Sequence, residues 1–185
     1  TTESAAASTE AVGAETAGTE AAGTEAAGNG KTFTVGFDAS FPPYGYQENG
    51  EYVGFDLDLA QEVCDRNGWE LVKTPIDWDA KEIELQSGTI DCVWNGMSVT
   101  PERKESMALT DKYLNNKIVL MALADSDIDV TSAKELADLK IGTQVDSSAL
   151  QMLMANEAYE SFKDNISEYE TYDTAIMDLK AGRVD

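Results

Sequence analysis

Histidine is absent from these 185 residues, and its absence excludes several common catalytic centres within them. A Ser-His-Asp triad, a Cys-His dyad and a zinc site with a histidine ligand all need an imidazole. Positive charge is scarce as well, because 13 Lys and Arg residues stand against 35 Asp and Glu residues and leave a net charge of -22. Nucleic-acid binding needs a basic surface, so we expect no nucleic-acid partner.

Cysteine and long hydrophobic runs are also rare. Cys64 and Cys92 are the two cysteines, and they lack the spacing of a Cys-x-x-Cys motif. We predict two buried free thiols with no metal, redox or cofactor role, and a disulfide is the alternative in an extracytoplasmic setting. No run approaches the roughly 18 apolar residues that a membrane span needs, so we predict no span in this sequence.

The first 30 residues form a low-complexity segment of Thr, Glu, Ala and Gly. The segment holds no Leu, Ile or aromatic side chain, so it has no apolar face to bury. A helix of Ala and Glu is the alternative, but glycines interrupt it, and each costs a helix about 1 kcal/mol. We predict that residues 1–30 are a disordered tether.

The next part of the chain alternates between predicted strands and predicted helices. Three segments have the patterns of strands: Thr32–Phe37, Trp69–Lys73 and Ile90–Trp94, the last buried on both faces. The predicted helix caps between them are Asp56 and a capping box of Asp79 and Glu82, with Gly68 and Gly88 as helix ends. This order predicts a parallel α/β unit, in which ligands bind at the carboxyl ends of the strands.

The loop after the third predicted strand has the chemistry of an anion site. Asn95–Ser98 is mostly small and polar, and Gly96 allows a ligand to approach the backbone closely. Thr100 is the predicted cap of a helix that begins with a proline and carries Arg103 in its first turn. A cation is disfavoured there by the helix dipole, so Arg103 has another use. We predict a carboxylate site, and a solvent-exposed Arg103 is the alternative.

A second group of strand and helix patterns follows an apolar run at Lys117–Leu123. Its predicted features are a Ser132–Glu135 capping box, a strand at Lys140–Gln144 and a last helix capped by Asp173. Leu179–Asp185 repeats the pattern of Leu85–Asp91, which precedes the Asn95–Ser98 loop. We therefore expect a truncated second unit, whose next strand would continue beyond Asp185.

Four motifs, in this order, carry a resemblance to a known family: Asp38–Tyr44, Gly54–Ala60, Leu85–Asp91 and Asn95–Arg103. Together they resemble the polar amino-acid solute-binding proteins of ABC importers, over a range from Thr32 to the last residue. The resemblance implies an α/β, periplasmic-binding-protein-like fold with two lobes, each a mostly parallel sheet flanked by helices. The implied lobes are residues 31–116 and, incomplete, residues 117–185, with a hinge near Asn115–Lys117.

The resemblance also implies that a ligand lies in a cleft between the lobes. Arg103, helped by Ser98 and nearby N–H groups, would bind its α-carboxylate. Asp38 would face a hydrogen-bond donor on its side chain. Phe41 and Trp78 would enclose the aliphatic part of the ligand, and their alternative role is packing within the first lobe.

From the second lobe, Ser147 and Ser148 would meet the same carboxylate, with helix capping as the alternative role. The resemblance implies no catalytic residue, no cofactor and no metal. The full set of expected ligand-binding residues is Asp38, Phe41, Trp78, Asn95, Gly96, Met97, Ser98, Arg103, Ser147 and Ser148.

These implications describe a monomeric binding protein that delivers a free polar amino acid to the permease of an ABC importer. Its location would be extracytoplasmic, at the outer face of a bacterial plasma membrane or in the periplasm. A signal sequence and a lipid-bearing cysteine would precede the tether. Two alternatives stay open: an amino-acid-sensing ectodomain of a receptor kinase, and a dehydratase or lyase on the same scaffold. An enzyme would need a carboxylate of perturbed pKa in the cleft, and Asp38 is the candidate.

Overall fold

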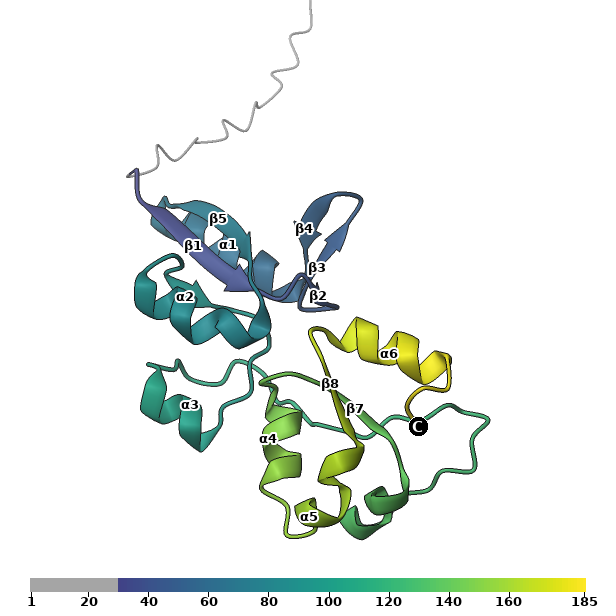
Figure 1. The fold of residues 1–185 in the computed structure, drawn as a ribbon. Coiled ribbons are helices and arrows are strands. Elements are labelled where there is room, and N and C mark those ends of the chain that lie inside the picture. The colour runs from purple at the N-terminus through teal and green to yellow at the C-terminus, as the bar shows by residue number, and fades with distance from the viewer. Residues whose placement is uncertain (1–29) are drawn as a thin grey trace, which may run out of the picture.

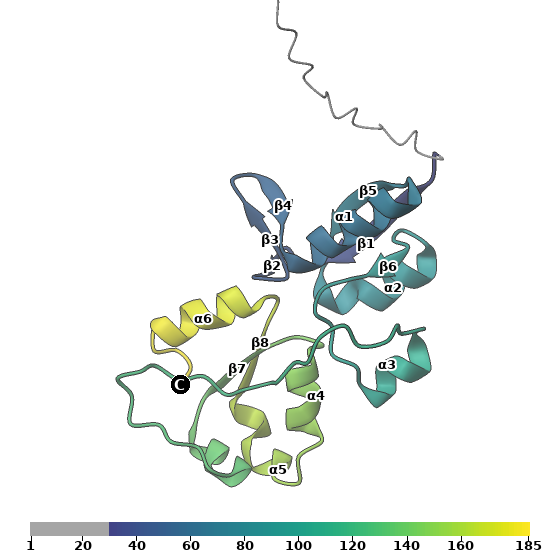
Figure 2. The ribbon, with the colours of Figure 1, turned by 180° about the vertical axis from the view of Figure 1, so that it is seen from behind.

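The computed structural model describes residues 30–185, so nearly all of the predicted tether lies outside the described residues. The described residues form two α/β lobes (Figure 1). Elements β1 to α3 build the first lobe, and elements η2 to α6 build the second. Residues 107–131 form neither helix nor strand and connect the lobes (Figure 2). The arrangement confirms the predicted α/β fold with two lobes.

A three-stranded parallel sheet is the centre of the first lobe. Its strands are, in spatial order, β5 (Glu70–Pro75), β1 (Thr32–Phe37) and β6 (Cys92–Val93). Helix α1 (Phe55–Asn67) packs against β5, and α2 (Lys81–Ser87) packs against β6. The remaining elements are an antiparallel sheet of β2 (Ser40–Phe41), β3 (Gly45–Glu48) and β4 (Glu51–Val53), and the helix α3 (Pro101–Ser106). The core lies at β1, where Val35 and Phe37 are fully buried.

The third strand is shorter and less buried than the sequence predicted. Of the run Ile90–Trp94, the pair Cys92–Val93 is the part that forms β6, and both residues are half-buried. The reason is that β6 is an edge strand, which pairs with β1 alone among the described strands, and its residues line a second cavity of about 540 Å³. Both cysteines are free, as predicted, but of the two Cys64 is buried and Cys92 is half-buried. Partial burial still raises the pKa of Cys92 to about 12.

Several predicted helix termini are confirmed. Gly68 and Gly88 end α1 and α2 in the left-handed conformation, with φ of 64° and 75°. Thr100 caps α3, because its hydroxyl accepts a hydrogen bond from a backbone N–H of the first turn at 3.3 Å. The Ser132–Glu135 capping box also forms, although the segment that it starts, η2 (Ala133–Asp138), is a 3-10 helix.

Asp56 is not the cap of α1, which is a correction to the sequence analysis. The helix begins at Phe55, and Gly54 before it has a φ of 133°, where a side chain would collide with the Tyr44 carbonyl. This tight turn, and no capping side chain, sets the start of the helix. Asp56 is instead fully buried and accepts a hydrogen bond from the Tyr113 hydroxyl, 2.9 Å away.

Two further predicted caps are wrong. A 3-10 turn, η1 (Trp78–Ala80), precedes α2, so Asp79 and Glu82 form no side-chain cap there. The last helix, α6 (Tyr172–Lys180), is capped by Thr171 in place of Asp173. The Thr171 hydroxyl accepts a hydrogen bond from the N–H three residues later at 3.2 Å, whereas Asp173 lies within the first turn.

The second lobe contains a two-stranded parallel sheet, β7 (Ile141–Gln144) and β8 (Ile166–Tyr169). The helical segments beside it are α4 (Ser148–Met154), α5 (Tyr159–Phe162), η3 (Lys163–Asn165) and α6. Its core is a cluster of Leu136, Ile141 and Phe162. In both lobes, no helix of residues 30–185 has the length and apolar character that crossing a membrane requires.

The two lobes share a hydrogen-bonded feature at the places of the sequence repeat. In the first lobe, the Asp91 N–H donates to the Thr34 carbonyl at 2.8 Å, and the Asp91 carboxylate accepts from the Thr34 N–H at 2.8 Å. In the second lobe, Asp185 makes the same two bonds with Lys140, at 2.9 and 2.8 Å. Asp91 and Asp185 therefore occupy corresponding positions beside β1 and β7.

Candidate functional site

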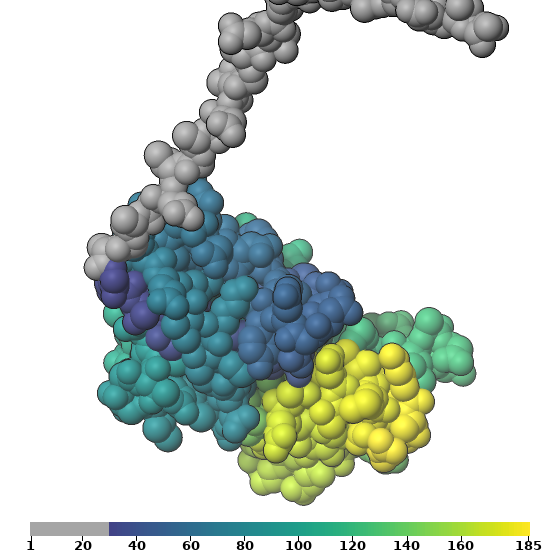
Figure 3. Space-filling model, turned by 90° about the horizontal axis from the view of Figure 1, so that it is seen from above, coloured from purple at the N-terminus to yellow at the C-terminus, as the bar shows by residue number. Residues whose placement is uncertain are grey.

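A cavity of about 550 Å³ lies between the two lobes. Its wall includes all ten residues that the sequence analysis expected to bind a ligand, eight from the first lobe and two from the second. The lobes also touch beside it, where the β2–β4 sheet approaches α6 (Figure 3). There the rings of Phe41 and Tyr172 lie 6.0 Å apart between their centroids. The structure thus gathers residues that are far apart in the sequence at one place.

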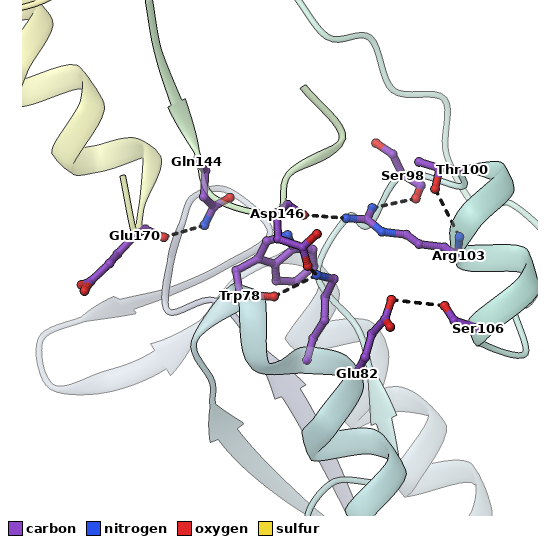
Figure 4. Close-up of polar contacts among 10 residues, drawn as sticks. Trp78, Glu82, Ser98, Thr100, Arg103, Ser106, Gln144, Asp146 and Glu170 are labelled. Atoms are coloured by element: carbon purple, nitrogen blue, oxygen red, sulfur yellow. Dashed lines mark hydrogen bonds and ion pairs between the residues drawn. The ribbon is translucent and has the colours of Figure 1, made fainter. Parts of the chain in front are cut away.

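Asp38 follows the end of β1, at the edge of the sheet where a ligand site was expected, and is 5% exposed. One carboxylate oxygen accepts a hydrogen bond from the Ser40 N–H at 2.8 Å. The other accepts one from the Gln144 side-chain amide at 2.7 Å, and this bond joins the lobes because Gln144 ends β7. Gln144 also donates to the Glu170 carbonyl, 3.0 Å away (Figure 4). Donors from both lobes therefore bond to the Asp38 carboxylate.

Arg103 is a second buried charge on the cavity wall, with an exposed fraction of 2%. Its Nη1 donates to the Ser98 carbonyl at 2.9 Å, and its Nη2 donates to the Asp146 carbonyl at 3.2 Å (Figure 4). Its Nε is buried and has no hydrogen-bond partner within residues 30–185. Burial lowers the pKa of Arg103, and the nearby carboxylates of Asp146 and Glu82 act to raise it. A guanidinium stays protonated under such influences. Because Arg103 is buried, the alternative of a solvent-exposed Arg103 is wrong.

The loop Asn95–Ser98 forms one edge of the cavity. Asn95 is 3% exposed, and its side-chain oxygen has no hydrogen-bond partner among the described residues. Gly96 has a φ of 58°, and a side chain there would press against the ring of Tyr44. The close approach of a ligand at this glycine stays a prediction, and the left-handed backbone and the nearby Tyr44 ring are two further reasons for a glycine there.

A buried acid supports this loop from the side of α1. The Tyr113 hydroxyl donates to Asp56 and accepts a hydrogen bond from the Gly96 N–H at 3.3 Å. Burial raises the pKa of Asp56, and the hydrogen bonds from Tyr113 and Gly96 act to lower it. Burial, followed by the contact with Asp56, raises the pKa of Tyr113, so the phenol keeps its proton and remains a donor. The backbone at Gly96 is thereby tied to α1.

Aromatic side chains form another part of the wall. Trp78 is 8% exposed, and the Arg103 guanidinium carbon lies 5.8 Å from its ring centroid, within the range of a cation–π contact. Phe41 stacks on Tyr44, with the ring centroids 5.6 Å apart. Phe41 and Trp78 line the cavity, whereas Tyr44 is not among its wall residues.

Among the described residues, the second lobe contributes uncharged side chains to the wall. The Ser147 hydroxyl accepts a hydrogen bond from the Leu150 N–H at 3.1 Å and so caps α4, which is the alternative role considered for it. The Ser148 and Ser98 hydroxyls are 3.2 Å apart and form a hydrogen bond between the lobes. The amide of Asn116, from the connecting segment, also donates to the Ser98 hydroxyl at 3.3 Å.

The cavity wall contains residues that sequence reasoning missed, among them Gln144, Tyr172 and Asn116. Gln144 carried a usable signal, because it was predicted to end a parallel strand and the same rule located Asp38. Tyr172 and Asn116 carried none, since neither follows a predicted strand. Their place at the cavity depends on how the second lobe and the connecting segment pack against the first.

Comparison with known families identifies the family of the chain. A family model described as bacterial extracellular solute-binding proteins, family 3, matches residues 33–183. The chain belongs to this family. Membership in family 3 confirms the resemblance that the four sequence motifs indicated.

Relatives of this family 3 chain are named for the amino acids that they bind. The lysine/arginine/ornithine-binding periplasmic protein of Escherichia coli is 30% identical over 156 residues, which cover 84% of this chain and 59% of that protein. The first curated relatives that the chain matches are covered over 58% to 59% of their length. The chain therefore spans well under two thirds of those proteins.

Solved structures of the same kind share the fold. An ABC uptake transporter substrate binding protein from Streptococcus pneumoniae, crystallised with bound histidine, has a TM-score of 0.75 at 41% identity, over 83% of this chain and 63% of that one. An ancestral amino-acid-binding protein, described as a precursor of cyclohexadienyl dehydratase, has a TM-score of 0.74 at 30% identity, over 83% of this chain and 68% of that one.

Proposed function

We propose that this chain binds a polar amino acid in the cavity between its lobes and acts as the substrate-binding component of an ABC importer. One observation carries the proposal: two buried side chains of opposite charge, Asp38 and Arg103, lie on the wall of a single cavity that both lobes form. A free amino acid offers a carboxylate and at least one cationic group, so its charges complement this pair.

Arg103 is the proposed anchor for the α-carboxylate of the ligand. A guanidinium has five N–H donors in a planar fork, and two of them are used by the carbonyls of Ser98 and Asp146. The buried Nε and the other donors are left for a carboxylate. The hydroxyls of Ser98 and Ser148 meet at the same wall and supply further donors, one from each lobe.

Asp38 is the proposed contact for a nitrogen-bearing side chain of the ligand. Its carboxylate is buried and keeps acceptor capacity beyond the bonds from Ser40 and Gln144. Phe41 and Trp78 offer apolar surface to the carbon chain of the ligand. The named relatives bind lysine, arginine, ornithine or histidine, so we propose a basic or amide side chain for the ligand of this chain.

Binding, and no reaction, is the role that we assign to this cavity. Asp38 is the one carboxylate residue among the described residues of the wall, and both of its oxygens accept hydrogen bonds. Acid–base catalysis needs a group that is free to exchange a proton with the substrate, and the described residues of this wall include no second carboxylate. Analysis of a bound amino acid after long incubation tests this, since a changed compound would reveal an enzyme.

The transport role is the broadest part of the proposal. Extracellular solute-binding proteins are the family to which the chain belongs, and we infer an extracytoplasmic location with a lipid anchor ahead of the tether. Closure of the lobes around the ligand would present one rigid form to a membrane permease. Ligand-dependent stimulation of the ATPase activity of the reconstituted importer is the measurement that checks this step.

Calorimetric titration of the purified protein with each common L-amino acid tests the binding proposal. We expect saturable binding of one or a few compounds with a basic, imidazole or amide side chain. Decarboxylated analogues of the same compounds should not bind, because Arg103 would lose its partner. Absence of binding across the whole panel, or equal binding of an amino acid and its decarboxylated amine, would contradict the proposal.

A further inference from the structure

Lys81 is a buried cation that the proposed ligand site does not use. It is the first residue of α2, its side chain is 1% exposed, and it is not part of the cavity wall. Its ammonium group donates to the Trp78 carbonyl at 2.9 Å and lies 5.0 Å from the centroid of the Trp78 ring. A buried ammonium group is unfavourable unless a carboxylate lies beside it.

The carboxylate that meets Lys81 comes from the other lobe. Asp146, in the turn between β7 and α4, forms an ion pair with the Lys81 ammonium through Oδ2. Of the four ion pairs within residues 30–185, this pair is the one that joins the lobes. The other three each lie within one lobe: Glu62–Arg66, Glu160–Lys163 and Asp178–Arg183.

Asp146 contacts a second buried cation with its backbone. While its carboxylate pairs with Lys81, its carbonyl accepts the hydrogen bond from Arg103 Nη2 at 3.2 Å (Figure 4). Asp146 has a φ of 49°, a left-handed conformation that Asp and Asn tolerate better than other side chains. One residue of the second lobe therefore contacts both buried cations that flank Trp78 in the first lobe.

We propose that Lys81 and Asp146 form an interlobe latch, which stabilises the arrangement in which the lobes touch and positions Arg103 for the ligand. The inference rests on the proposed function and assigns a positioning role to two residues that are not expected to touch the ligand. When the lobes separate, Lys81 loses its carboxylate, and Arg103 loses the Asp146 carbonyl. Opening is therefore opposed by a buried charge left without its partner.

The latch raises the apparent affinity for the ligand. A protein whose binding-competent form is partly populated binds with an affinity reduced by that fraction. By favouring contact between the lobes before the ligand arrives, the Lys81–Asp146 pair increases this fraction. The pair also brings the Asp146 carbonyl to Arg103, so the guanidinium is already oriented when a carboxylate enters.

The variant Asp146→Asn tests the latch with a small change. Asparagine keeps the shape of the side chain, tolerates the left-handed backbone and retains the carbonyl that Arg103 contacts, so the charge is what is lost. We expect the dissociation constant for the amino acid that the protein binds to rise at least about tenfold. Lys163→Met is the matched control, because it removes an exposed ion pair within one lobe. The affinity of this variant for the amino acid should stay within about twofold of that of the unchanged protein.

A double-mutant cycle with Lys81→Met distinguishes a coupling between Lys81 and Asp146 from independent effects of the two substitutions on the protein. Methionine replaces the apolar stem of Lys81 and removes the buried charge. The double variant should bind the ligand more tightly than the product of the two single effects predicts, because the penalty of an unpaired Lys81 disappears. Purely multiplicative effects would overturn the proposal. If Lys81→Met does not fold, Asp146→Asn alone decides, since Asp146 has a side-chain exposure of 41% and is not part of a core.

Small-angle X-ray scattering without ligand gives a readout that does not depend on binding. We expect Asp146→Asn to have a larger radius of gyration than the unchanged protein, and Lys163→Met to match it. If the unchanged protein binds an amino acid but Asp146→Asn alters neither affinity nor radius, the latch fails and the proposed function stands. If the unchanged protein binds no amino acid, the proposed function fails, and the scattering comparison decides the latch by itself.

Discussion

The first lobe and the second lobe are built on one pattern, but they contribute different kinds of chemical group to the cavity. In each lobe, one aspartate forms two hydrogen bonds with the backbone of a single residue in or next to a parallel strand. Asp91 bonds to Thr34 in this way, and Asp185 bonds to Lys140. Yet the buried charged residues of the wall, Asp38 and Arg103, both belong to the first lobe, and its other charged residue, Lys117, belongs to the connecting segment. From the second lobe come the Gln144 amide, which donates to Asp38, the Asp146 carbonyl, which accepts from Arg103, and the Ser148 hydroxyl, which bonds to Ser98.

This division teaches how a site between two lobes is assembled. Buried charges need fixed partners, and the first lobe holds Asp38 and Arg103 on the ends of a six-residue strand and a capped helix. Neutral donors and acceptors tolerate transient exposure to water when the lobes separate. The second lobe therefore acts as a cover that completes the hydrogen bonding of the first. The exception is Asp146, whose charge meets Lys81.

The largest expected effects concern the separate cores. Phe37 is fully buried in β1, and Phe162 is 1% exposed in the second lobe. Replacing either by Ala should cost about 3–5 kcal/mol of unfolding free energy, because a cavity remains. Hydrogen exchange followed by mass spectrometry should show that Phe37→Ala lowers protection mainly in the first lobe and Phe162→Ala mainly in the second. Equal loss in both lobes would break the comparison, since the lobes would then unfold as one unit.

The next largest effect concerns the charge that the first lobe contributes. Arg103→Lys keeps the charge but loses the planar fork of donors. Charge-assisted hydrogen bonds contribute about 1.5–3 kcal/mol, so the affinity for an amino acid should fall at least about tenfold. Calorimetry measures this, and Arg66→Lys is the matched control, because Arg66 forms an exposed pair on α1. A variant at Arg103 with undiminished affinity would remove the carboxylate anchor from the proposal.

Two neighbouring serines sharpen the role of the second lobe. Ser148 bonds to Ser98 across the cavity, while Ser147 caps α4. Ser148→Ala should weaken ligand binding by about 0.5–1.5 kcal/mol and leave thermal stability nearly unchanged. Ser147→Ala should lower the unfolding free energy by about 0.5–2 kcal/mol through loss of the cap. Titration and thermal melting of both variants check this, and the reverse pattern would exchange the two roles.

The smallest effects test the repeat itself. Asp91 and Asp185 are exposed, and each accepts one backbone hydrogen bond at 2.8 Å. Asp91→Ala and Asp185→Ala should each cost about 0.5–1 kcal/mol of stability, the lower part of the range for a single hydrogen bond. Denaturant unfolding measures both. A clear difference between the two losses of unfolding free energy would show that the corresponding bonds contribute unequally to the stability of the two lobes.

Local sequence patterns predicted helix ends well where the ends depend on the chemistry of residues that are neighbours in the sequence. Thr100 followed by Pro101, and the glycines at positions 68 and 88, mark helix ends because capping geometry depends on neighbouring residues. Asp56 and Asp173 failed as caps because Gly54 and Thr171, two positions earlier in each case, set the helix starts. The edge position of β6 was also missed, since strand order is decided between segments that are distant in sequence.

The candidate site divides in the same way. Asp38 was placed by the rule for parallel strands, and the Asn95–Ser98 loop with Arg103 by its composition. The roles of Phe41, Trp78 and Ser148 came from the resemblance to a family. The strand end at Gln144 had a sequence signal, but its bond to Asp38 had none, and neither did the pair of Lys81 with Asp146, because each contact joins two lobes.

By itself, the sequence determined the α/β class, the family, most helix ends and the residues at the carboxyl ends of strands. These follow from periodicity, from capping chemistry and from motifs that are contiguous along the chain. The tertiary structure alone decided that Arg103 is buried, that Asp38 is bonded from both lobes, and that Lys81 finds its carboxylate in Asp146. The physical reason is that burial and charge pairing depend on distances in space, which no local pattern of side chains encodes.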